Sequence, residues 1–216
     1  MIPRFLKKIY SVIILVYKKK FVHSLFVLFN GEKKRYDYQL SENSIVIDGG
    51  GYNGDFSKKI FNLYKCKIFI FEPYEFYYSK LKKIFKNNKK ISVFSEALSN
   101  ANKNVNLVKL GDETFISNSK KDNKSIVKAI SIISFIKKNN LKKIDLLKLN
   151  VEGAEYSILE DILNSDLQGR FVNLQIQFHK SYENKNRYNQ IKNKLEKKYK
   201  LIWRYPWIWE SWKLKH

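Results

Sequence analysis

The chain has 216 residues, of which 44% are hydrophobic, and this fits one globular domain with a modest extension. Its single cysteine, Cys66, excludes an internal disulfide and favours a reducing compartment, so we expect a cytoplasmic protein. The formal net charge is +22, and 37 of the 42 basic residues are lysines. Such a charge suits nucleic acid, anionic membrane or acidic glycan, but lysines spread along helices more often form a solvated face.

The first 30 residues differ in composition from the rest of the chain. Residues 9–17 form an apolar run between two groups of lysines, too short for the ~20 residues that a membrane span needs. No small-residue cleavage site of a signal peptide follows. We favour a helix packed on the domain; the alternative is an interfacial helix in peripheral contact with anionic lipid. The predicted division is an N-terminal basic and apolar helical extension over residues 1–40 and a main domain over residues 41–216.

A strand, a glycine turn and a helix are predicted over residues 44–56. Ile45 to Ile47 read as a buried strand, and Asp48 and the glycine-rich turn follow. An apolar stripe that begins at Phe56 predicts the helix. A strand, glycine turn and helix in this order can bring bare backbone N–H groups against a ligand. The alternative is a tight turn that needs small residues but binds no ligand. The glycines also satisfy G-x-G-x-x-G, so a nicotinamide cofactor stays open at this point.

A second unit follows about twenty residues later. Residues 67–71 predict a buried strand that ends at Glu72, where a ribose-binding acid sits in nucleotide-binding βαβ units. The alternative is a solvated acid at a strand end. Pro73 suits the first turn of the next helix, which carries its apolar stripe between Tyr77 and Phe85.

The remaining elements alternate between strands and helices. Residues 91–94 predict a third strand, 99–127 a short antiparallel excursion, and 111–124 a polar loop. A strand at 128–130 precedes a helix capped by Ser131. Further strands are expected at 144–149 and 171–178, helices at 155–163 and 188–195, and a terminal hairpin around Pro206. The predicted fold is α/β, a mostly parallel sheet with helices on both faces.

Residues 145–155 decide between the open interpretations. Lys148, Asn150, Glu152, Gly153 and Glu155 crowd the carboxyl end of a buried strand, which is the edge where open α/β sheets bind ligands. If this strand lies beside the first one, Asn150 faces the glycine turn. A preference of acidic residues for a helix N-terminus explains Glu155 but not the lysine or the asparagine.

These motifs resemble the FkbM-type family of S-adenosylmethionine-dependent methyltransferases, from about residue 44 to the C-terminus. The family's D-x-G-A-x-x-G-D-F reads here as residues 48–56, its F-E-P as residues 71–73, and its L-L-K-I-D-V-E-G-A-E as residues 146–155. Gln177-Phe178-His179 matches the family's acid or amide followed by a histidine on the next strand. Gly51 replaces the usual alanine, and Asn150 replaces the usual aspartate. Asn150 keeps a hydrogen-bonding oxygen but lacks the negative charge of the aspartate.

The resemblance implies a Rossmann-like class I methyltransferase fold with an antiparallel C-terminal strand. It also implies S-adenosyl-L-methionine as cofactor and a hydroxyl of a sugar or polysaccharide precursor as acceptor. Glu72 would hold the ribose hydroxyls, the turn would cradle the methionine part, and Glu96 and Ala97 would lie beside the adenine. The implied cofactor-binding residues are Asp48, Gly49, Gly50, Gly51, Asn53, Gly54, Glu72, Pro73, Glu96, Ala97 and Asn150.

A sugar hydroxyl is a poor nucleophile, so a base that accepts its proton should help by roughly 10²–10⁴-fold. His179 is the first candidate, and Glu152 is the second, as the base or as the group that orients His179. No zinc site is predicted, because the three histidines are scattered and no second cysteine joins them. Oxygen atoms of Asn150, Glu152 and Glu155 could hold Mg²⁺, but we expect no metal.

Three competing functions remain open at this level. The positive charge suggests an RNA methyltransferase, although no RNA-binding module or arginine-rich segment accompanies it. A non-catalytic, membrane-associated protein that keeps the fold is the second. A nicotinamide oxidoreductase is the third, and Asp48 directly before the glycines together with the Asn150 motif argues against it. Oligomeric state is not predicted.

Overall fold

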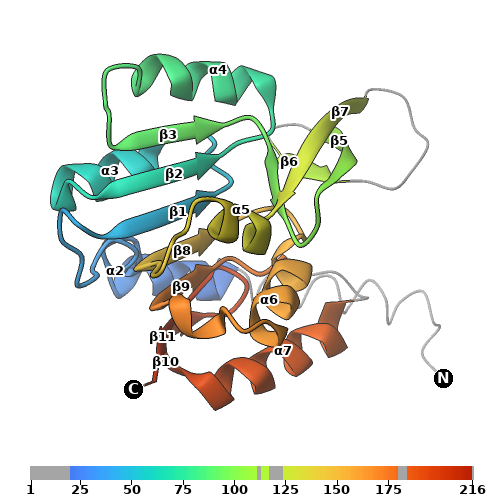
Figure 1. Cartoon of the computed structure of the whole chain (residues 1–216). Helices are drawn as coiled ribbons and strands as arrows, with labels where there is room; N and C mark the ends of the chain where they lie inside the picture. Colours follow the sequence, from blue (N-terminus) through green and yellow to red (C-terminus); the bar gives the residue numbers. More distant parts are fainter. Residues whose placement is uncertain (1–19, 111–112, 117–123, 180–183, 216) are drawn as a thin grey trace.

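The computed structural model describes residues 20–110, 113–116, 124–179 and 184–215 (Figure 1). Its main sheet has the strand order β10-β11-β9-β8-β1-β2-β3. The strands span Ile45–Gly49 (β1), Lys67–Phe71 (β2), Ile91–Phe94 (β3), Leu146–Leu149 (β8), Asn173–Ile176 (β9), Tyr199–Tyr205 (β10) and Trp209–Leu214 (β11). β3, β2, β1, β8 and β9 are parallel, whereas β11 is antiparallel to both β9 and β10. The predicted mostly parallel sheet with an antiparallel C-terminal strand is confirmed.

Helices cover both faces of this sheet, because the parallel strands are apolar on both sides (Figure 1). α3 (Asp55–Tyr64) and α4 (Glu75–Ile84) pack on one face. The other face is covered by α5 (Ile132–Lys138), α6 (Glu155–Asn164) and α7 (Asn184–Lys198). A short helix, η1 (Gln168–Arg170), follows α6 and leads into β9. The predicted cap is confirmed, since the Ser131 hydroxyl accepts the N–H of Ser134 at 3.2 Å. Pro73 differs from the prediction: α4 begins at Glu75, so the proline lies before the helix.

A second sheet with the order β4-β7-β5-β6 extends from the carboxyl-terminal edge of the first (Figure 1). Its strands are Ala97–Ser99 (β4), Lys103–Leu110 (β5), Glu113–Ile116 (β6) and Lys124–Ser131 (β7). β5 pairs antiparallel with β6 and β7, as the alternating pattern predicted. Two details of the prediction are wrong, because β7 is longer than residues 128–130 and β6 forms inside the expected loop 111–124. Residues 111–112 and 117–123 of that loop lie outside the described residues.

The described part of the N-terminal segment packs against the sheet. Residues 20–28 are helical, and Phe26 is buried against Tyr205 and Trp209 at the β10–β11 turn. α2 (Gly31–Lys34) follows, and Tyr36 joins the core under α3. Residues 1–19, which carry the apolar run, lie outside the described residues. Within the described ranges no helix has the length and apolar character needed to cross a bilayer.

Candidate active site

The glycine turn begins where β1 ends and leaves no room for side chains, and its Gly50 and Gly51 N–H groups are bonded within the protein and not free for a ligand. The N–H groups of Gly50 and Gly51 donate to the carbonyl oxygen of Phe71 at the end of β2, at 2.9 and 3.1 Å. Gly50 has φ of +82°, and a Cβ on it would overlap the carbonyl oxygen of Asn150. A Cβ on Gly51 would overlap Ile70. Side chains are therefore excluded here, and Asn150 faces the turn as predicted, since β1 and β8 are neighbours.

Beneath the turn lies a buried ion pair. Asp48 is fully buried, and its carboxylate accepts from Lys148 Nζ at 2.8 Å and from the Ser57 hydroxyl at 2.6 Å. Lys148 Nζ also donates to the carbonyl oxygens of Gly49 at 3.3 Å and Gly50 at 2.6 Å. Asp48 was predicted to contact the cofactor, but its side chain is directed into the protein. There it binds Lys148, which in turn donates to the carbonyl oxygens of the glycine turn. Lys148 was not predicted as a site residue, although a lysine inside an apolar strand signals that it needs a buried partner.

Glu72 stands beside the turn at the end of β2. Its two carboxylate oxygens accept the backbone N–H groups of Tyr52 at 2.7 Å and Tyr74 at 2.9 Å. Burial raises the pKa of Glu72, and the two N–H bonds and Lys148 oppose that rise. Each carboxylate oxygen has a further lone pair, so both remain able to accept a ligand hydroxyl. Tyr52, with φ of +46°, lies with its ring 4.4 Å from that of Tyr77.

The remaining predicted cofactor residues divide into two groups. Pro73 and Glu96 line a cleft of ≈ 320 Å³ between the end of β2 and the second sheet, and Ala97 is buried directly after Glu96. Gly54 (φ +84°) precedes α3 and packs under Leu81. The side chain of Asn53 accepts from Lys80 Nζ at 2.7 Å, so it is directed toward α4.

Asn150 lies at the end of β8, and its backbone N–H donates to the carbonyl oxygen of Gly49 at 3.0 Å. Its side-chain oxygen Oδ1 is buried and has no hydrogen-bond partner among the described residues. Buried polar atoms are nearly always paired, so an unpaired oxygen beside a bare glycine turn indicates a ligand donor there.

The loop after β8 is shaped by Glu155, the first residue of α6. This fully buried carboxylate accepts the N–H groups of Val151 and Gly153, both at 2.8 Å. The residue between them, Glu152, has φ of +50°, a conformation that costs a non-glycine residue roughly 1–2 kcal/mol. Such strain in a loop held by a buried acid is typical of functional sites, and here it presents the Glu152 side chain outward with 25% exposure.

The His179 ring contacts both glutamates, Glu152 and Glu155. The contact with Glu152 was expected from the sequence, and the contact with Glu155 was not. The Nε2 atom of His179 lies 3.0 Å from Glu152 Oε2, and its Nδ1 lies 2.8 Å from Glu155 Oε1. Burial lowers the pKa of His179, but the hydrogen bonds and charges of the two glutamates outweigh burial and raise the pKa to about 10. At neutral pH both ring nitrogens therefore carry protons and donate. An imidazolium has no lone pair to accept a proton, so this protonation state does not suit His179 to the role of general base.

These features fit S-adenosylmethionine. A turn without side chains, an acid that can accept ribose hydroxyls, and the unpaired oxygen of Asn150 suit a nucleoside joined to an amino acid. Within the described ranges no group of three or more His, Cys, Asp or Glu side chains is arranged to hold a metal ion.

Comparisons with known proteins agree with this fit. The family model of the Methyltransferase FkbM domain matches residues 48–201, well over half of the chain. No curated protein matches the chain in sequence. Among solved structures the chain is similar to a protein described as an rRNA methylase from Clostridium thermocellum, with 10% identity and a TM-score of 0.55 over 88% of this chain and 96% of that one. It is also similar to a protein described as a methyltransferase from Streptococcus mutans in complex with S-adenosylhomocysteine, with 14% identity and a TM-score of 0.51 over 82% and 91% of the two chains.

At such identities the structural likeness shows the fold, a class I methyltransferase fold, and the family model carries the assignment. The chain belongs to the FkbM family of S-adenosylmethionine-dependent methyltransferases.

Proposed function

We propose that this methyltransferase methylates a hydroxyl oxygen of a sugar or polysaccharide precursor. The observation that carries the proposal is the Glu152 carboxylate, which is partly exposed at the carboxyl edge of the sheet and oriented by His179. When bound, S-adenosylmethionine supplies an electrophilic methyl group on its sulfonium. The chain must then bind the hydroxyl, orient it and accept its proton.

In this proposal the Glu152 carboxylate accepts that proton. Its Oε2 accepts one hydrogen bond from His179, and the carboxylate keeps lone pairs for a hydroxyl. A base in this role should contribute roughly 10²–10⁴-fold to turnover. His179 acts on the reaction through Glu152: its second nitrogen is held by buried Glu155, so the ring cannot rotate without breaking that bond. His179 is thus a positioning residue in this proposal.

Three of the four described arginines do not favour an RNA acceptor, whereas the fourth, Arg204, is exposed. Arg35, Arg170 and Arg187 are bound within the protein, to Glu32, to the carbonyl oxygen of Leu141 and to Glu160. Specific phosphate recognition mostly uses free guanidinium groups.

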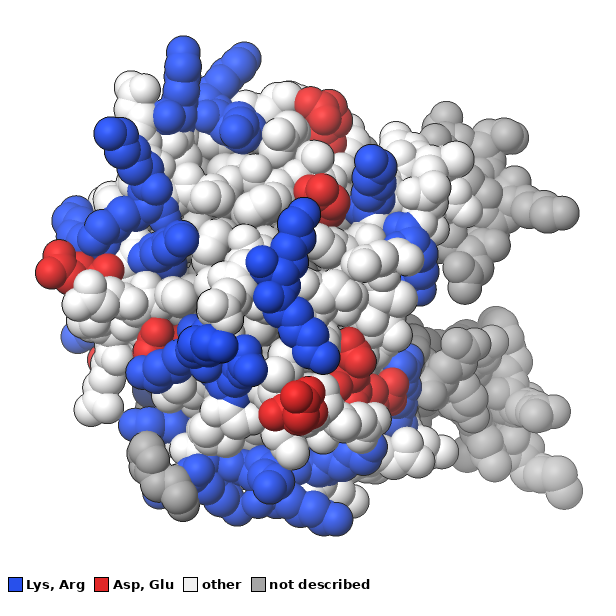
Figure 2. Space-filling model, in the orientation of Figure 1, with Lys and Arg blue, Asp and Glu red and all other residues white. Residues whose placement is uncertain are grey.

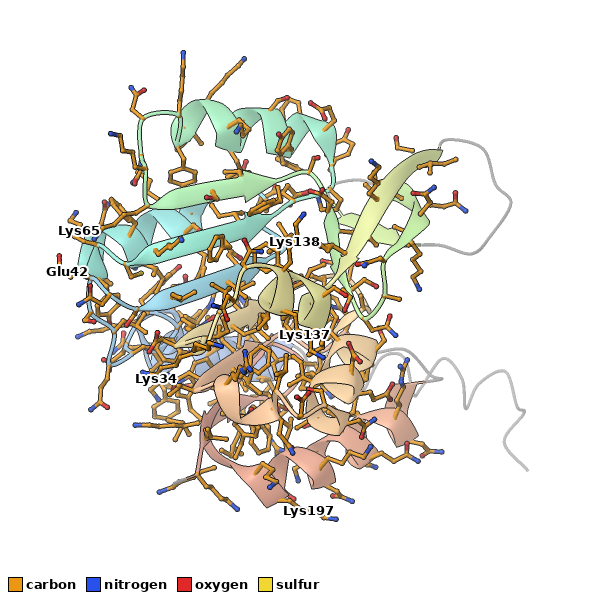
Figure 3. The ribbon with its side chains drawn as sticks, viewed as in Figure 1. Lys34, Glu42, Lys65, Lys137, Lys138 and Lys197 are labelled. Carbon is orange, nitrogen blue, oxygen red and sulfur yellow. The ribbon has the colours of Figure 1, made fainter. Side chains whose placement is uncertain are left out.

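The positive charge is spread over the molecule instead of lying along one path. Lys and Arg side chains occupy the upper, left and lower parts of the visible face (Figure 2). The lysines labelled in Figure 3 lie in α2 (Lys34), after the end of α3 (Lys65), in α5 (Lys137 and Lys138) and in α7 (Lys197). This is typical of a solvated surface and supports the glycan acceptor over a nucleic acid.

The test is transfer of a radiolabelled methyl group from S-adenosylmethionine to two acceptor sets, nucleotide sugars with oligosaccharides and total RNA. The proposal predicts labelled sugar, with the label on oxygen. Glu152→Gln keeps the shape and should lower turnover by about 10²–10⁴-fold without changing affinity for S-adenosylhomocysteine. Glu160→Gln is the matched control and should keep turnover. Glu160 lies in α6, where it pairs with Arg187. Labelled RNA with unlabelled sugars would overturn the acceptor assignment.

A further inference from the structure

An apolar patch lies on the outer side of the helix at residues 20–28. Phe21, Val27, Leu28 and Phe29 are 64%, 62%, 71% and 56% exposed. They are four of the ten large hydrophobic side chains that are exposed in the described part of the chain, and they fall within nine residues. Phe21, Leu28 and Phe29 are spaced i, i+7 and i+8, so they share one helical face. We call these four residues the apolar patch.

The opposite side of this helix is fixed to the domain. The Phe26 ring packs edge-on against Tyr205 at a centroid distance of 5.1 Å, and Trp209 completes the cluster. Asn30, with φ of 53°, ends the helix, and a Cβ on Gly31 would overlap the Phe26 ring. The helix therefore cannot turn its apolar patch inward without losing these contacts, and the patch is presented outward in a preformed orientation.

The charges around the patch identify what it fits. The described residues 20–36 contain four basic residues and one acidic residue, and Lys20 and Lys33 are exposed on either side of the patch in the sequence. We propose that the apolar patch docks the protein on the surface of an anionic lipid bilayer. Aromatic and aliphatic side chains enter the boundary between headgroups and acyl chains, and the lysines contact the lipid phosphates.

A second copy of the chain fits the patch less well than a bilayer does. Two patches brought face to face would bring two sets of basic residues together in a chain whose net charge is already +22. Like charges in contact oppose association, whereas the same charges attract an anionic surface. Nucleic acid would satisfy the charges but would leave the aliphatic side chains in water. This proposal does not depend on the acceptor of the methyl group.

The test is flotation of the full chain with vesicles at physiological salt. Vesicles of phosphatidylglycerol and phosphatidylcholine should bind at least tenfold more protein than vesicles of phosphatidylcholine alone, and binding should fall as salt rises. Leu28→Ser/Phe29→Ser should reduce binding at least tenfold. Phe76→Ser/Ile126→Ser is the matched control, because these side chains are 65% and 72% exposed elsewhere, and it should bind as the parent chain does.

Three results of the binding and light-scattering measurements would overturn the proposal. They are no vesicle binding by the parent chain, equal loss of binding in both double variants, and a dimer in light scattering that only Leu28→Ser/Phe29→Ser dissociates. The last result would identify a second copy as the occupant. Thermal melting of each variant separates loss of docking from loss of the fold, since these exposed positions should leave the melting temperature unchanged. An effect on binding with a large fall in melting temperature would also count against docking.

Discussion

Replacing Lys148 by methionine should strongly destabilise the protein. The lysine side chain is 5% exposed and that of Asp48 is 0% exposed, so the substitution leaves a carboxylate buried with only a serine hydroxyl as partner. The carbonyl oxygens of Gly49 and Gly50 lose the same donor. Breaking a buried pair by removing one partner costs about 3–5 kcal/mol, a large part of the 5–15 kcal/mol that typical domains possess.

The measurement is urea unfolding followed by tryptophan fluorescence, with Lys143→Met as the control. Lys143 also forms an ion pair, 2.7 Å from Asp145, but its side chain is 63% exposed, so its loss should cost at most about 1 kcal/mol. The double variant Asp48→Asn/Lys148→Met removes both charges and should be more stable than Lys148→Met alone.

Binding of S-adenosylhomocysteine by the folded fraction of Lys148→Met should weaken about tenfold, because the turn loses the hydrogen bonds that Lys148 donates to Gly49 and Gly50. The reasoning is refuted if Lys148→Met unfolds at the urea concentration of Lys143→Met. It is also refuted if the double variant is less stable than the single one, because the uncompensated Asp48 charge would then not be the cause.

Three further outcomes are expected. Glu72→Ala should weaken S-adenosylhomocysteine binding in calorimetry by about 1.5–3 kcal/mol, the worth of one hydrogen bond to a charged group, and an unchanged affinity would contradict its assignment to the ribose. Gly50→Ala should lower the free energy of unfolding by about 2–5 kcal/mol through left-handed strain and overlap with Asn150, whereas Gly169→Ala, with open space around its Cβ, should be nearly neutral. The folded pKa of His179, about 10, exceeds its ordinary value of 6.5, so its stabilising effect is complete below pH 6.5 and is lost as pH rises through about 10. The stability difference between the parent chain and His179→Asn should therefore shrink between pH 6 and pH 10, and a constant difference would show that the ion pairs are not the cause.

The apolar pattern was sufficient to predict the main sheet. Residues 45–47 are apolar, and residues 146–149 are apolar apart from Lys148; parallel strands covered by helices on both faces bury such runs. Because carboxyl ends of parallel strands share one edge, the pattern also brought the glycine turn, Glu72 and Asn150 together. The start of α4 was mispredicted, because a proline is accepted equally well before a helix and in its first turn.

The protonation of the site could not be read from the sequence. A histidine three residues after β9 has no assigned partner until the fold places Glu155 and Glu152 on its two nitrogens. The partner of Lys148 was likewise hidden, since Asp48 lies a hundred residues earlier and meets it only through the pairing of β1 with β8. Sequence spacing predicts elements, whereas charge states follow from contacts between elements.

The charges at this edge are almost balanced within the protein. Asp48 is neutralised by Lys148, and the imidazolium of His179 neutralises one of the two glutamates that it contacts. One negative charge of the Glu152 and Glu155 pair is therefore left at the mouth of the site. The balance explains how Glu152 and Glu155 can lie three residues apart and share one histidine in a folded protein.

Glu72 adds a second negative charge that forms no ion pair among the described residues and is held by two backbone N–H groups. The edge is thus locally negative in a chain whose net charge is +22, and such a field attracts cations. S-adenosylmethionine carries the extra positive charge of its sulfonium, whereas S-adenosylhomocysteine does not. If Glu72 and Glu152 have the proposed roles, their negative charges favour the donor over the product, which would support exchange of product for fresh donor after each turnover.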